Sequence, residues 1–270
     1  MKKVLSISLG SSSRDHKVKT TILGEDFSIE RKGTDGDKKK AAAMFTELDG
    51  NYDAFGIGGI DLHIYSAGRC YTFRDAKNLI RNVDQTPAVD GSGLKNTLER
   101  KVINDLYNEN EINFTNKTVL MVSAVDRFGM AETFVEMGSD LIFGDLIFGL
   151  GIPIALRSLK SLEMVARLAA PIITKLPFEF IYPTGSKQDE VKLSHKYKRY
   201  YQKADIIAGD FHFIKKYIPD NLSGKIIITN TVTETDIKDL KKRHLDRLVT
   251  TTPELNGRSF GTNVMEAVLV

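Results

Sequence analysis

The chain has little cysteine and little net charge, and each of these features narrows the class of protein to which it can belong. Cys70 is the only cysteine among 270 residues. A single cysteine excludes an internal disulfide bond and is typical of a reducing compartment. The net charge is only +3, because 38 lysines and arginines nearly balance 35 aspartates and glutamates. A chain so close to neutral has no overall attraction for nucleic acid or anionic lipid, so we expect neither as a partner.

The sequence also lacks an apolar run long enough to cross a membrane. Its most apolar segment, residues 141–156, is interrupted by Asp145, three glycines and Pro153, whereas a spanning helix needs about 20 consecutive apolar residues. The first residues, MKKVLSISLGSSS, have too short an apolar centre for a signal peptide and are typical of a strand. With 41% hydrophobic and 27% charged residues, the composition predicts a cytoplasmic globular protein with a full core.

The stretch KTVLMVSAVDRFGMAETFVEMGSDLIFGD, residues 117–145, has the pattern of a β-turn-α-β unit. An apolar run is followed by a small polar turn at 123–129 and by apolar residues at helical spacing over 130–137. Gly138 ends that helix, and 141–143 is a second buried strand. Because this crossover joins parallel strands, the predicted fold class is α/β, with a Rossmann-like parallel sheet in the C-terminal lobe.

The turn at residues 123–129 is the candidate cofactor site. A helix that begins at the carboxyl end of a strand favours an anion there. Asp145 follows Ser123 by 22 positions, close to the spacing of the carboxylate that binds a ribose hydroxyl in dinucleotide folds. The glycine fingerprint is mostly absent, because Ser123 and Val125 replace the first two glycines and only Gly129 remains. Packing of helix on sheet without a nucleotide is the alternative interpretation.

Two motifs in the N-terminal half combine strand ends with charged residues. FGIGGIDLH ends a strand with glycines that indicate close approach of a backbone or a ligand, and alternation puts Asp61 and His63 on one face. In DGSGLKNTLER, Lys95 lies in the first turn of a helix, where its charge opposes the dipole. We interpret Lys95, with Asp61 or Asp90, as a proton-transfer or substrate-orienting group. A solvated strand face and a solvent-facing lysine are the alternatives.

A turn of small residues after the first strand, from Gly10 to Ser13, leads to Arg14 and His16. Its backbone N–H groups and the two basic side chains could hold a phosphate. A serine-rich surface turn is the alternative that we favour, since small residues suit turns with or without a ligand. The residues that follow, 18–31, have the pattern of a hairpin around a glycine.

Polar clusters follow one strand after another in the last third, at residues 209–212, 230–233 and 251–254. In an open parallel sheet such strand ends line one ligand crevice, so we expect them to meet the turn at Ser123. Four residues after the last loop could reach the same crevice; they are Arg258, Ser259, Thr262 and Asn263. Capping of the final helix by Thr262 or Asn263 is the alternative.

Two more helices are predicted between these regions. Residues 157–176 have a broad apolar face, with Pro171 expected to kink the helix, and this face suits a core or a homodimer interface. Residues 192–203 hold five lysines or arginines and three tyrosines without an acid. That stripe could bind phosphates or bases. In a nearly neutral chain we favour a solvated helix with its tyrosines turned inward.

Six motifs are distinctive: GTDGD, FGIGGIDL, DGSGLKNTLER, SAVDRFGMAE, IAGDF and TTTPELNGRSFGTNVMEA. With them the chain resembles, nearly end to end, a family of bacterial proteins labelled quinate 5-dehydrogenase. The related shikimate and quinate dehydrogenases join an N-terminal substrate domain to a C-terminal Rossmann domain and use a lysine and an aspartate on the hydroxyl that is oxidised. The resemblance implies that Lys95 is this lysine. It also implies a loose match of Ser6 and Ser8 to the substrate-binding Ser-x-Ser, and of Asn230-Thr231 to an Asn-x-Thr segment.

Together these features predict an N-terminal mixed α/β substrate lobe at residues 1–112 and a Rossmann-like nucleotide-binding lobe at 113–270. The expected function is an NAD(P)-dependent oxidoreductase acting on a small polyhydroxy acid of the quinate or shikimate type. NAD is favoured over NADP, because an unpaired Asp145 would repel a 2′-phosphate. The predicted catalytic residues are Lys95, Asp61 and Asp90. The predicted cofactor-binding residues are Ser123, Asp126, Arg127, Phe128, Gly129, Asp145, Asn230 and Thr231.

Two alternatives remain open from the residues. One is a lyase or transferase that binds a phosphorylated or nucleoside ligand, in which Asp61, His63 and His212 would make a metal ion possible. The other is a non-catalytic ligand-binding protein that keeps the fold without a competent cofactor turn.

Overall fold

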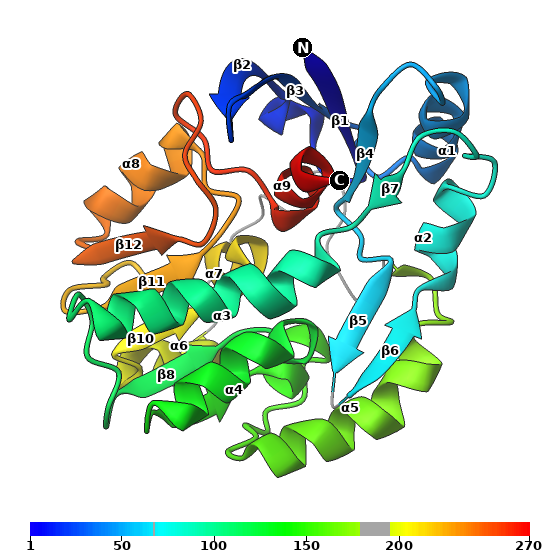
Figure 1. Ribbon diagram of the computed structural model, residues 1–270. Coiled ribbons are helices and arrows are strands. Elements are labelled where there is room, and N and C mark those ends of the chain that lie inside the picture. Colours follow the sequence, from blue (N-terminus) through cyan, green and yellow to red (C-terminus); the bar gives the residue numbers. More distant parts are fainter. Residues whose placement is uncertain (67, 179–194) are drawn as a thin grey trace.

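The computed structural model describes residues 1–66, 68–178 and 195–270. A five-stranded mixed sheet in the order β2-β3-β1-β4-β7 forms the N-terminal lobe (Figure 1). Its strands are β1 (Lys2–Ser8), β2 (His16–Ile22), β3 (Glu25–Gly33), β4 (Ala54–Gly58) and β7 (Ala88–Val89). Only β2 is antiparallel to its neighbour. The predicted hairpin is confirmed: β2 and β3 are joined through Leu23 and Gly24, both in the left-handed region.

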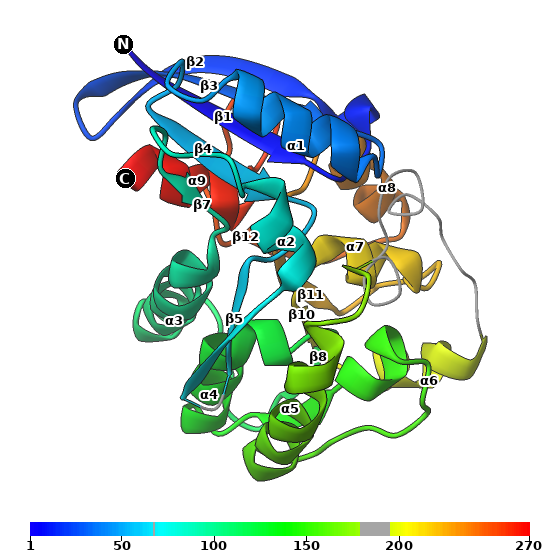
Figure 2. The same ribbon diagram turned by 90° about the vertical axis from the view of Figure 1, so that its right-hand side faces the viewer.

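Helices cover both faces of this sheet (Figure 1, Figure 2). On one face lies α1 (Lys38–Glu47), which is capped by Asp37. On the other lies α9 (Thr262–Leu269), the last helix of the chain, whose apolar residues pack with those of β1 and β3. The C-terminus therefore returns to the N-terminal lobe, and the predicted boundary at residue 112 stays a prediction.

The segments between the lobes connect them. The hairpin of β5 (His63–Ser66) and β6 (Arg69–Thr72) leads into α2 (Arg74–Leu79). It extends from the N-terminal sheet toward α5 (Leu159–Ile173) of the other lobe (Figure 1). Beside it, α3 (Ser92–Asn108) packs on both α9 and α4 (Phe128–Glu136).

The C-terminal lobe is built on a five-stranded sheet that is parallel throughout, in the order β12-β11-β10-β8-β9. Its strands are β8 (Thr118–Met121), β9 (Asp140–Phe143), β10 (Ile206–Ala208), β11 (Ile226–Thr229) and β12 (Arg247–Thr250). The predicted β-turn-α-β unit is β8, α4 and β9. The α/β fold class with a Rossmann-like C-terminal sheet is thus confirmed.

Helices enclose this sheet as well, because its short strands alternate apolar residues to both faces. One face is covered by α3, α4 and α5. The other is covered by α6 (His195–Lys203), α7 (Phe211–Lys216) and α8 (Glu234–Lys242). Tyr200 and Tyr201 of α6 are buried in that core, as the favoured interpretation predicted. Residues 192–194 of the helix predicted at 192–203 lie outside the described residues.

Three short elements complete the fold near the strand ends. They are the 3-10 turns η1 (Ser12–Arg14) and η2 (Val125–Arg127) and the single-turn π-helix η3 (Asp145–Gly149). Because η2 follows β8 and η3 follows β9, both lie at the carboxyl edge of the parallel sheet, where ligands bind in such folds.

Candidate functional site

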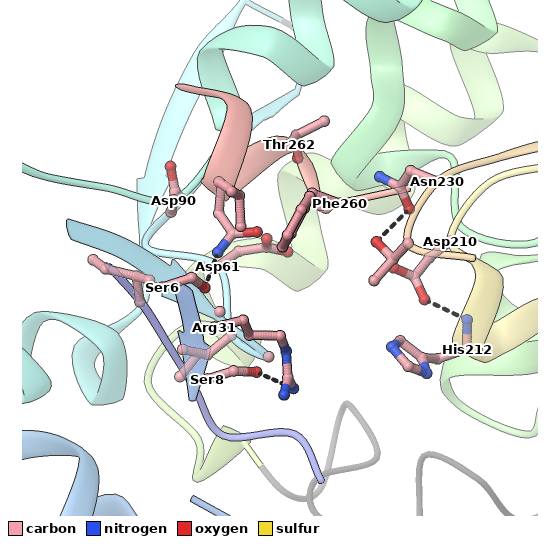
Figure 3. Close-up of a pocket in the computed structure, with 18 of the residues that line it drawn as sticks. Ser6, Ser8, Arg31, Asp61, Asp90, Asp210, His212, Asn230, Phe260 and Thr262 are labelled. Atoms are coloured by element: carbon pink, nitrogen blue, oxygen red, sulfur yellow. Dashed lines mark hydrogen bonds between the residues drawn. The ribbon is translucent and has the colours of Figure 1, made fainter. Parts of the chain in front are cut away.

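A cleft lies between the two lobes at the carboxyl ends of their parallel strands. Ser6 and Ser8 of β1 line one side, and Asp210 and Asn230, which follow β10 and β11, line the other. Figure 3 shows these side chains around one space. β9 lies on one side of β8 and β10 on the other, so the cleft is at the switch point of the sheet.

The predicted convergence of strand ends is met in part. Asp126, Asp210, His212 and Asn230 all line this cleft. The cluster at 251–254 does not line it, because the loop turns inward: Thr252 Oγ1 donates to the backbone oxygen of Phe260 at 2.5 Å.

Lys95, Asp61 and Asp126 form a charged group at the floor of the cleft. Lys95 lies in the first turn of α3, and its side chain is 9% exposed. Its Nζ donates to Asp61 Oδ1 at 2.6 Å and to Asp126 Oδ2 at 3.3 Å. The solvent-facing alternative for Lys95 is therefore wrong. Two carboxylates hold a cation that the helix dipole alone would oppose.

The pKa values of Asp61 and Lys95 are both raised, but for different reasons. Burial raises the pKa of Asp61 to about 6; the charge of Lys95 opposes this shift, and that of Asp126 adds to it. Burial lowers the pKa of Lys95, but the two carboxylates outweigh it, so its pKa is raised and the ammonium group persists at neutral pH. A carboxylate that titrates near neutrality beside a fixed cation is suited to proton transfer.

Asp90 holds the backbone just after Asp61. Its Oδ2 accepts from the N–H groups of Leu62 and His63, both at 2.7 Å, and its Oδ1 accepts from Ser92 N at 3.1 Å. Burial raises the pKa of Asp90, but these hydrogen bonds outweigh it and the pKa is lowered. Asp90 lines the cleft, yet it positions the chain there and does not pair with the lysine.

Asp145 occupies the anion position of the turn after β8. Its Oδ1 accepts from the backbone N–H groups of Ala124 and Val125, both at 2.8 Å. No cation pairs with Asp145 among the described residues, but its Oδ1 engages N–H groups that a cofactor phosphate would use. Burial raises the pKa of Asp145 to about 7 against the lowering effect of these hydrogen bonds. Its Oδ2 is buried and has no hydrogen-bond partner within the described ranges.

The remaining residues of this turn pack inside the lobe. Arg127 is buried and forms an ion pair with Glu99 of α3, at the edge of the cleft. Gly129 allows α4 to approach α3, since a Cβ there would lie 2.6 Å from Arg100 Nε. Phe128 packs on the core beneath α4. Phe128 and Gly129 line neither the cleft nor the cavity described next but a small crevice beside Lys95 and Asp126, and the cofactor role predicted for them stays a prediction.

A mostly apolar cavity lies beside the carboxylates of Asp61 and Asp126, under α5. Its apolar lining includes Val122, Val125, Leu146, Val165 and Ala169. Ser123 lines it as well, and Ser123 Oγ is buried without a hydrogen-bond partner in the described part of the chain. The cavity thus offers an apolar surface and unsatisfied polar atoms next to the proton-transfer group.

His63 is not paired with Asp61. Its Nδ1 lies 3.1 Å from Thr72 Oγ1 and 3.6 Å from Cys70 Sγ on the neighbouring strand β6. The two residues do not share a strand face, because β5 begins at His63 and Asp61 precedes it. Among the described residues, no three His, Cys, Asp or Glu side chains are grouped to hold a metal ion.

The N-terminus of α9 covers the β4 side of the cleft. Asn263 Nδ2 donates to Ser6 Oγ at 2.9 Å, and Gly261 is an N-cap without a side-chain bond, so the capping alternative is wrong. A Cβ at Gly56 would lie 2.9 Å from the backbone oxygen of Asn263. The glycines of FGIGG were expected to allow close approach of a backbone or of a ligand. At Gly56 it is another backbone segment that approaches closely.

Three buried arginines line the other end of the cleft: Arg14, Arg31 and Arg258, which are 6%, 7% and 4% exposed. Ser12 and Ser13 of the preceding turn are exposed, as the favoured surface-turn interpretation expects, whereas Arg14 itself is buried. Arg31 was not identified from the sequence. A signal was present, because it continues the inward alternation of Phe27 and Ile29 along β3, where a charged residue needs a buried partner or a ligand.

Asn230 and Thr231 lie on the side of the cleft that Arg14 reaches. Thr231 has a left-handed backbone, with φ of 59°, and its carbonyl oxygen accepts from Arg14 at 2.6 Å. Its hydroxyl donates to Asn230 Oδ1 at 3.2 Å. Both residues line the cleft with Asp126 and Arg127, but neither lines the cavity at Ser123.

The fold and the cleft define a two-lobed α/β protein with a Rossmann-like sheet and a charged site at its switch point. The chain belongs to a family described as a domain of unknown function (DUF8754), whose profile matches residues 93–270. A second family, also a domain of unknown function (DUF8753), matches residues 3–90. No curated protein matches the sequence.

The chain is distantly similar in structure to several dehydrogenases and related enzymes. A dipicolinate synthase component from Bacillus halodurans has a TM-score of 0.32 and 9% identity, covering 92% of this chain and 89% of that one. NAD-dependent malic enzyme from Thermotoga maritima has a TM-score of 0.34 and 11% identity, covering 94% and 66%. The bifunctional methylenetetrahydrofolate dehydrogenase/cyclohydrolase FolD from Campylobacter jejuni has a TM-score of 0.34 and 12% identity, covering 99% of this chain and 84% of that one.

The predictions about a membrane, a homodimer and nucleic acid depend on the surface of the protein. No helix in the described ranges is long and apolar enough to cross a membrane. Part of the apolar face of α5 is exposed, including Met164, Leu168 and Ile172. The homodimer that this face suggested stays a prediction, as do the cytoplasmic location and the absence of a nucleic-acid partner.

Proposed function

We propose that this protein is an NAD(P)-dependent oxidoreductase that binds a small polyhydroxy acid of the quinate or shikimate type between its lobes. The observation that carries the proposal is the contact of Lys95 Nζ with Asp61 Oδ1 at 2.6 Å, on the wall of a cleft. Oxidation of an alcohol needs a group that removes the hydroxyl proton, and this pair suits that task.

Asp61 is the proton acceptor in this proposal, and Lys95 is the group that orients the substrate oxygen. Lys95 keeps its ammonium group at neutral pH, because two carboxylates contact it. It therefore donates a hydrogen bond and does not take up a proton. Asp61 has its pKa raised by burial to about 6, so it is ionised at pH 7, and its side chain is 24% exposed. Lys95 stabilises the developing alkoxide while the proton passes to Asp61.

The apolar cavity beside this pair is the place where the residues suit a nicotinamide cofactor. A bound NAD(P) would accept the hydride that the alcohol loses. Val122, Val125 and Leu146 would hold one of its rings. Ser123 Oγ and Asp145 Oδ2, both buried without a partner in the described chain, would bind its polar groups. The charge of Asp145 favours NAD over NADP.

The turn after β8 is poorly suited to the pyrophosphate of this cofactor. The N–H groups of Ala124 and Val125 already donate to Asp145 Oδ1, and a phosphate beside that carboxylate would be repelled. This observation favours a second candidate function, a lyase or transferase that uses the same proton-transfer pair on an anionic ligand without a dinucleotide.

Titration of the purified chain with NADH and NADPH, followed by nicotinamide fluorescence, separates the two candidates. The oxidoreductase predicts saturable binding, together with NAD(P)⁺ reduction in the presence of quinate- or shikimate-type acids. Absence of saturable binding in protein shown to be folded by circular dichroism removes the oxidoreductase and retains the second candidate.

The variant Lys95→Met then tests the chemistry. It is expected to abolish turnover while cofactor binding remains. Lys101→Met is the matched control, because Lys101 lies on the same helix with a side chain that is 71% exposed. Turnover by Lys95→Met at the rate of the control would remove Lys95 from the reaction.

A further inference from the structure

Arg14, Arg31 and Arg258 bring three guanidinium groups to one end of the cleft from distant parts of the chain. Arg14 crosses between the lobes, where it donates to the backbone oxygen of Thr231 at 2.6 Å and to Asp236 Oδ2 at 3.3 Å. Arg258 donates to the backbone oxygen of Arg14. Two of the three arginines are therefore in direct contact.

Arg31 belongs to the opposite wall. Its guanidinium group donates to Asp15 Oδ1 at 2.9 Å, to the backbone oxygen of Ser11 at 3.0 Å and to Ser8 Oγ at 3.0 Å. Figure 3 shows Arg31 and Ser8 across the open space from His212. These bonds fix the guanidinium group at the surface of the cleft.

Two of the three arginines have a carboxylate partner in the part of the chain that the structure describes. Asp15 pairs with Arg31, and Asp236 is shared between Arg14 and Lys215.

Arg258 is the arginine of the three that has no counter-charge among the described residues. It is 4% exposed. It has no ion-pair partner within residues 1–66, 68–178 and 195–270, and its buried Nε has no hydrogen-bond partner there. Burial, and then the charges of Arg31 and Arg14, lower the pKa of Arg258 to about 9. A buried cation without a counter-charge is costly, and an anion in the cleft would remove that cost.

We propose that Arg14, Arg31 and Arg258 form a binding site for a doubly charged phosphate monoester group on the ligand of this cleft. Forked guanidinium donors suit the oxygens of a phosphate group, and the phosphate would supply the counter-charge that Arg258 lacks among the described residues. The identification of that ligand as the substrate rests on the proposed function. Because the arginines and the Lys95–Asp61 pair line one cleft, the polyhydroxy acid of the proposed function would carry a phosphate, held at the arginines with a hydroxyl at Lys95.

Inorganic phosphate is the probe, used on the full chain without cofactor. At a constant ionic strength set with NaCl and at pH 7.5, phosphate is expected to raise the melting temperature saturably and to give a calorimetric isotherm. Sulfate, a dianion of the same shape, should bind similarly, and acetate much more weakly. Phosphate that acts no more strongly than acetate or chloride overturns the proposal.

The variant Arg258→Gln removes the unpaired charge and keeps a donor for the backbone oxygen of Arg14. It is expected to weaken phosphate binding roughly tenfold or more. Arg167→Gln, which removes the same charge from an exposed ion pair with Glu163, should bind as the wild type does. Equal phosphate affinity in both variants overturns the proposal. If Arg258→Gln does not fold, the comparison of phosphate with acetate on the wild type decides.

Lys95→Met separates this site from the proposed function, because it removes the group that orients the substrate oxygen and leaves the arginines. Phosphate binding should survive this variant. Phosphate binding without any nicotinamide binding supports the anion site and removes the oxidoreductase. Nicotinamide-dependent turnover without phosphate binding removes the anion site and leaves the oxidoreductase in place.

Discussion

Asp145 Oδ1 accepts a hydrogen bond of 2.8 Å from the backbone N–H of Val125, so a carboxylate of the protein lies where a Rossmann fold binds a phosphate. The same oxygen accepts from Ala124. A dinucleotide phosphate would meet this carboxylate at the turn, and the two hydrogen bonds have consequences that do not depend on a ligand.

Asp145→Asn is expected to change how stability depends on pH. Burial raises the pKa of Asp145 from 3.8 to about 7. Its folded pKa therefore exceeds its unfolded pKa, and the stability that it contributes is fully present below about pH 4 and is lost as the pH rises through 7. Asparagine keeps an oxygen for the two N–H groups and does not titrate.

The variant should therefore gain stability relative to the wild type between pH 4 and pH 8, by on the order of 1–4 kcal/mol at most. Urea unfolding at a series of pH values measures this difference. Asp61 titrates in both proteins and cancels. A difference that stays constant over the range would contradict the raised pKa.

Asp61→Asn is expected to reduce turnover by roughly 10²–10⁴-fold, since a general base contributes about that much. In the wild type, kcat/KM should rise with pH through about 6, where Asp61 loses its proton, and then reach a plateau. Asp105→Asn is the control, because Asp105 is exposed and pairs only with Lys101 among the described residues. A rise that persists unchanged in Asp61→Asn would assign the titration to another group.

Arg258→Gln is expected to raise the melting temperature of the ligand-free chain, because it removes a buried charge that lacks a counter-charge among the described residues. A gain of about 1 kcal/mol corresponds to about 2–4 °C for a protein of this size. Scanning calorimetry in chloride buffer, beside Arg167→Gln, measures the shift. A fall of several degrees would mean that the charge of Arg258 is already compensated in the free protein.

Gly91→Ala is expected to destabilise the fold by roughly 2–5 kcal/mol, the sum of left-handed strain and overpacking. Gly91 has φ of 88°, and a Cβ there would lie 2.3 Å from Asn263 N. Gly149→Ala is the matched control, since a Cβ at Gly149 meets nothing within 4 Å. Denaturant midpoints of the two variants compare them, and equal midpoints would contradict the close packing of α9 on Gly91.

Much of the fold follows from local patterns that the sequence displays. The β8-α4-β9 unit and the β2-β3 hairpin were both predictable, because each depends on residues within about 30 positions. The first-turn position of Lys95 in α3 was predictable for the same reason.

The hydrogen-bond partners of the site residues were less predictable from the sequence. Lys95 was expected near Asp61 or Asp90, and Asp61 is the one that it contacts, because Asp90 is engaged by the backbone of 62–63. Asp145 was predicted at the correct strand end, but its engagement with the Ser123 turn was not. Strand-end position identifies which side chains reach a crevice, and it does not say which hydrogen bonds they have already made.

The amino-acid pattern alone was sufficient for a two-lobed α/β chain with polar strand ends gathered at one edge, because helical and strand periods are properties of neighbouring residues. Only the folded chain could bring Arg14 to Asp236, 222 positions away, or bury Arg258 without a counter-charge among the described residues. Such pairings arise when the last helix packs back on the first sheet. The charge balance of the cleft is therefore a property of the tertiary structure, since it depends on distances between residues that no local pattern connects.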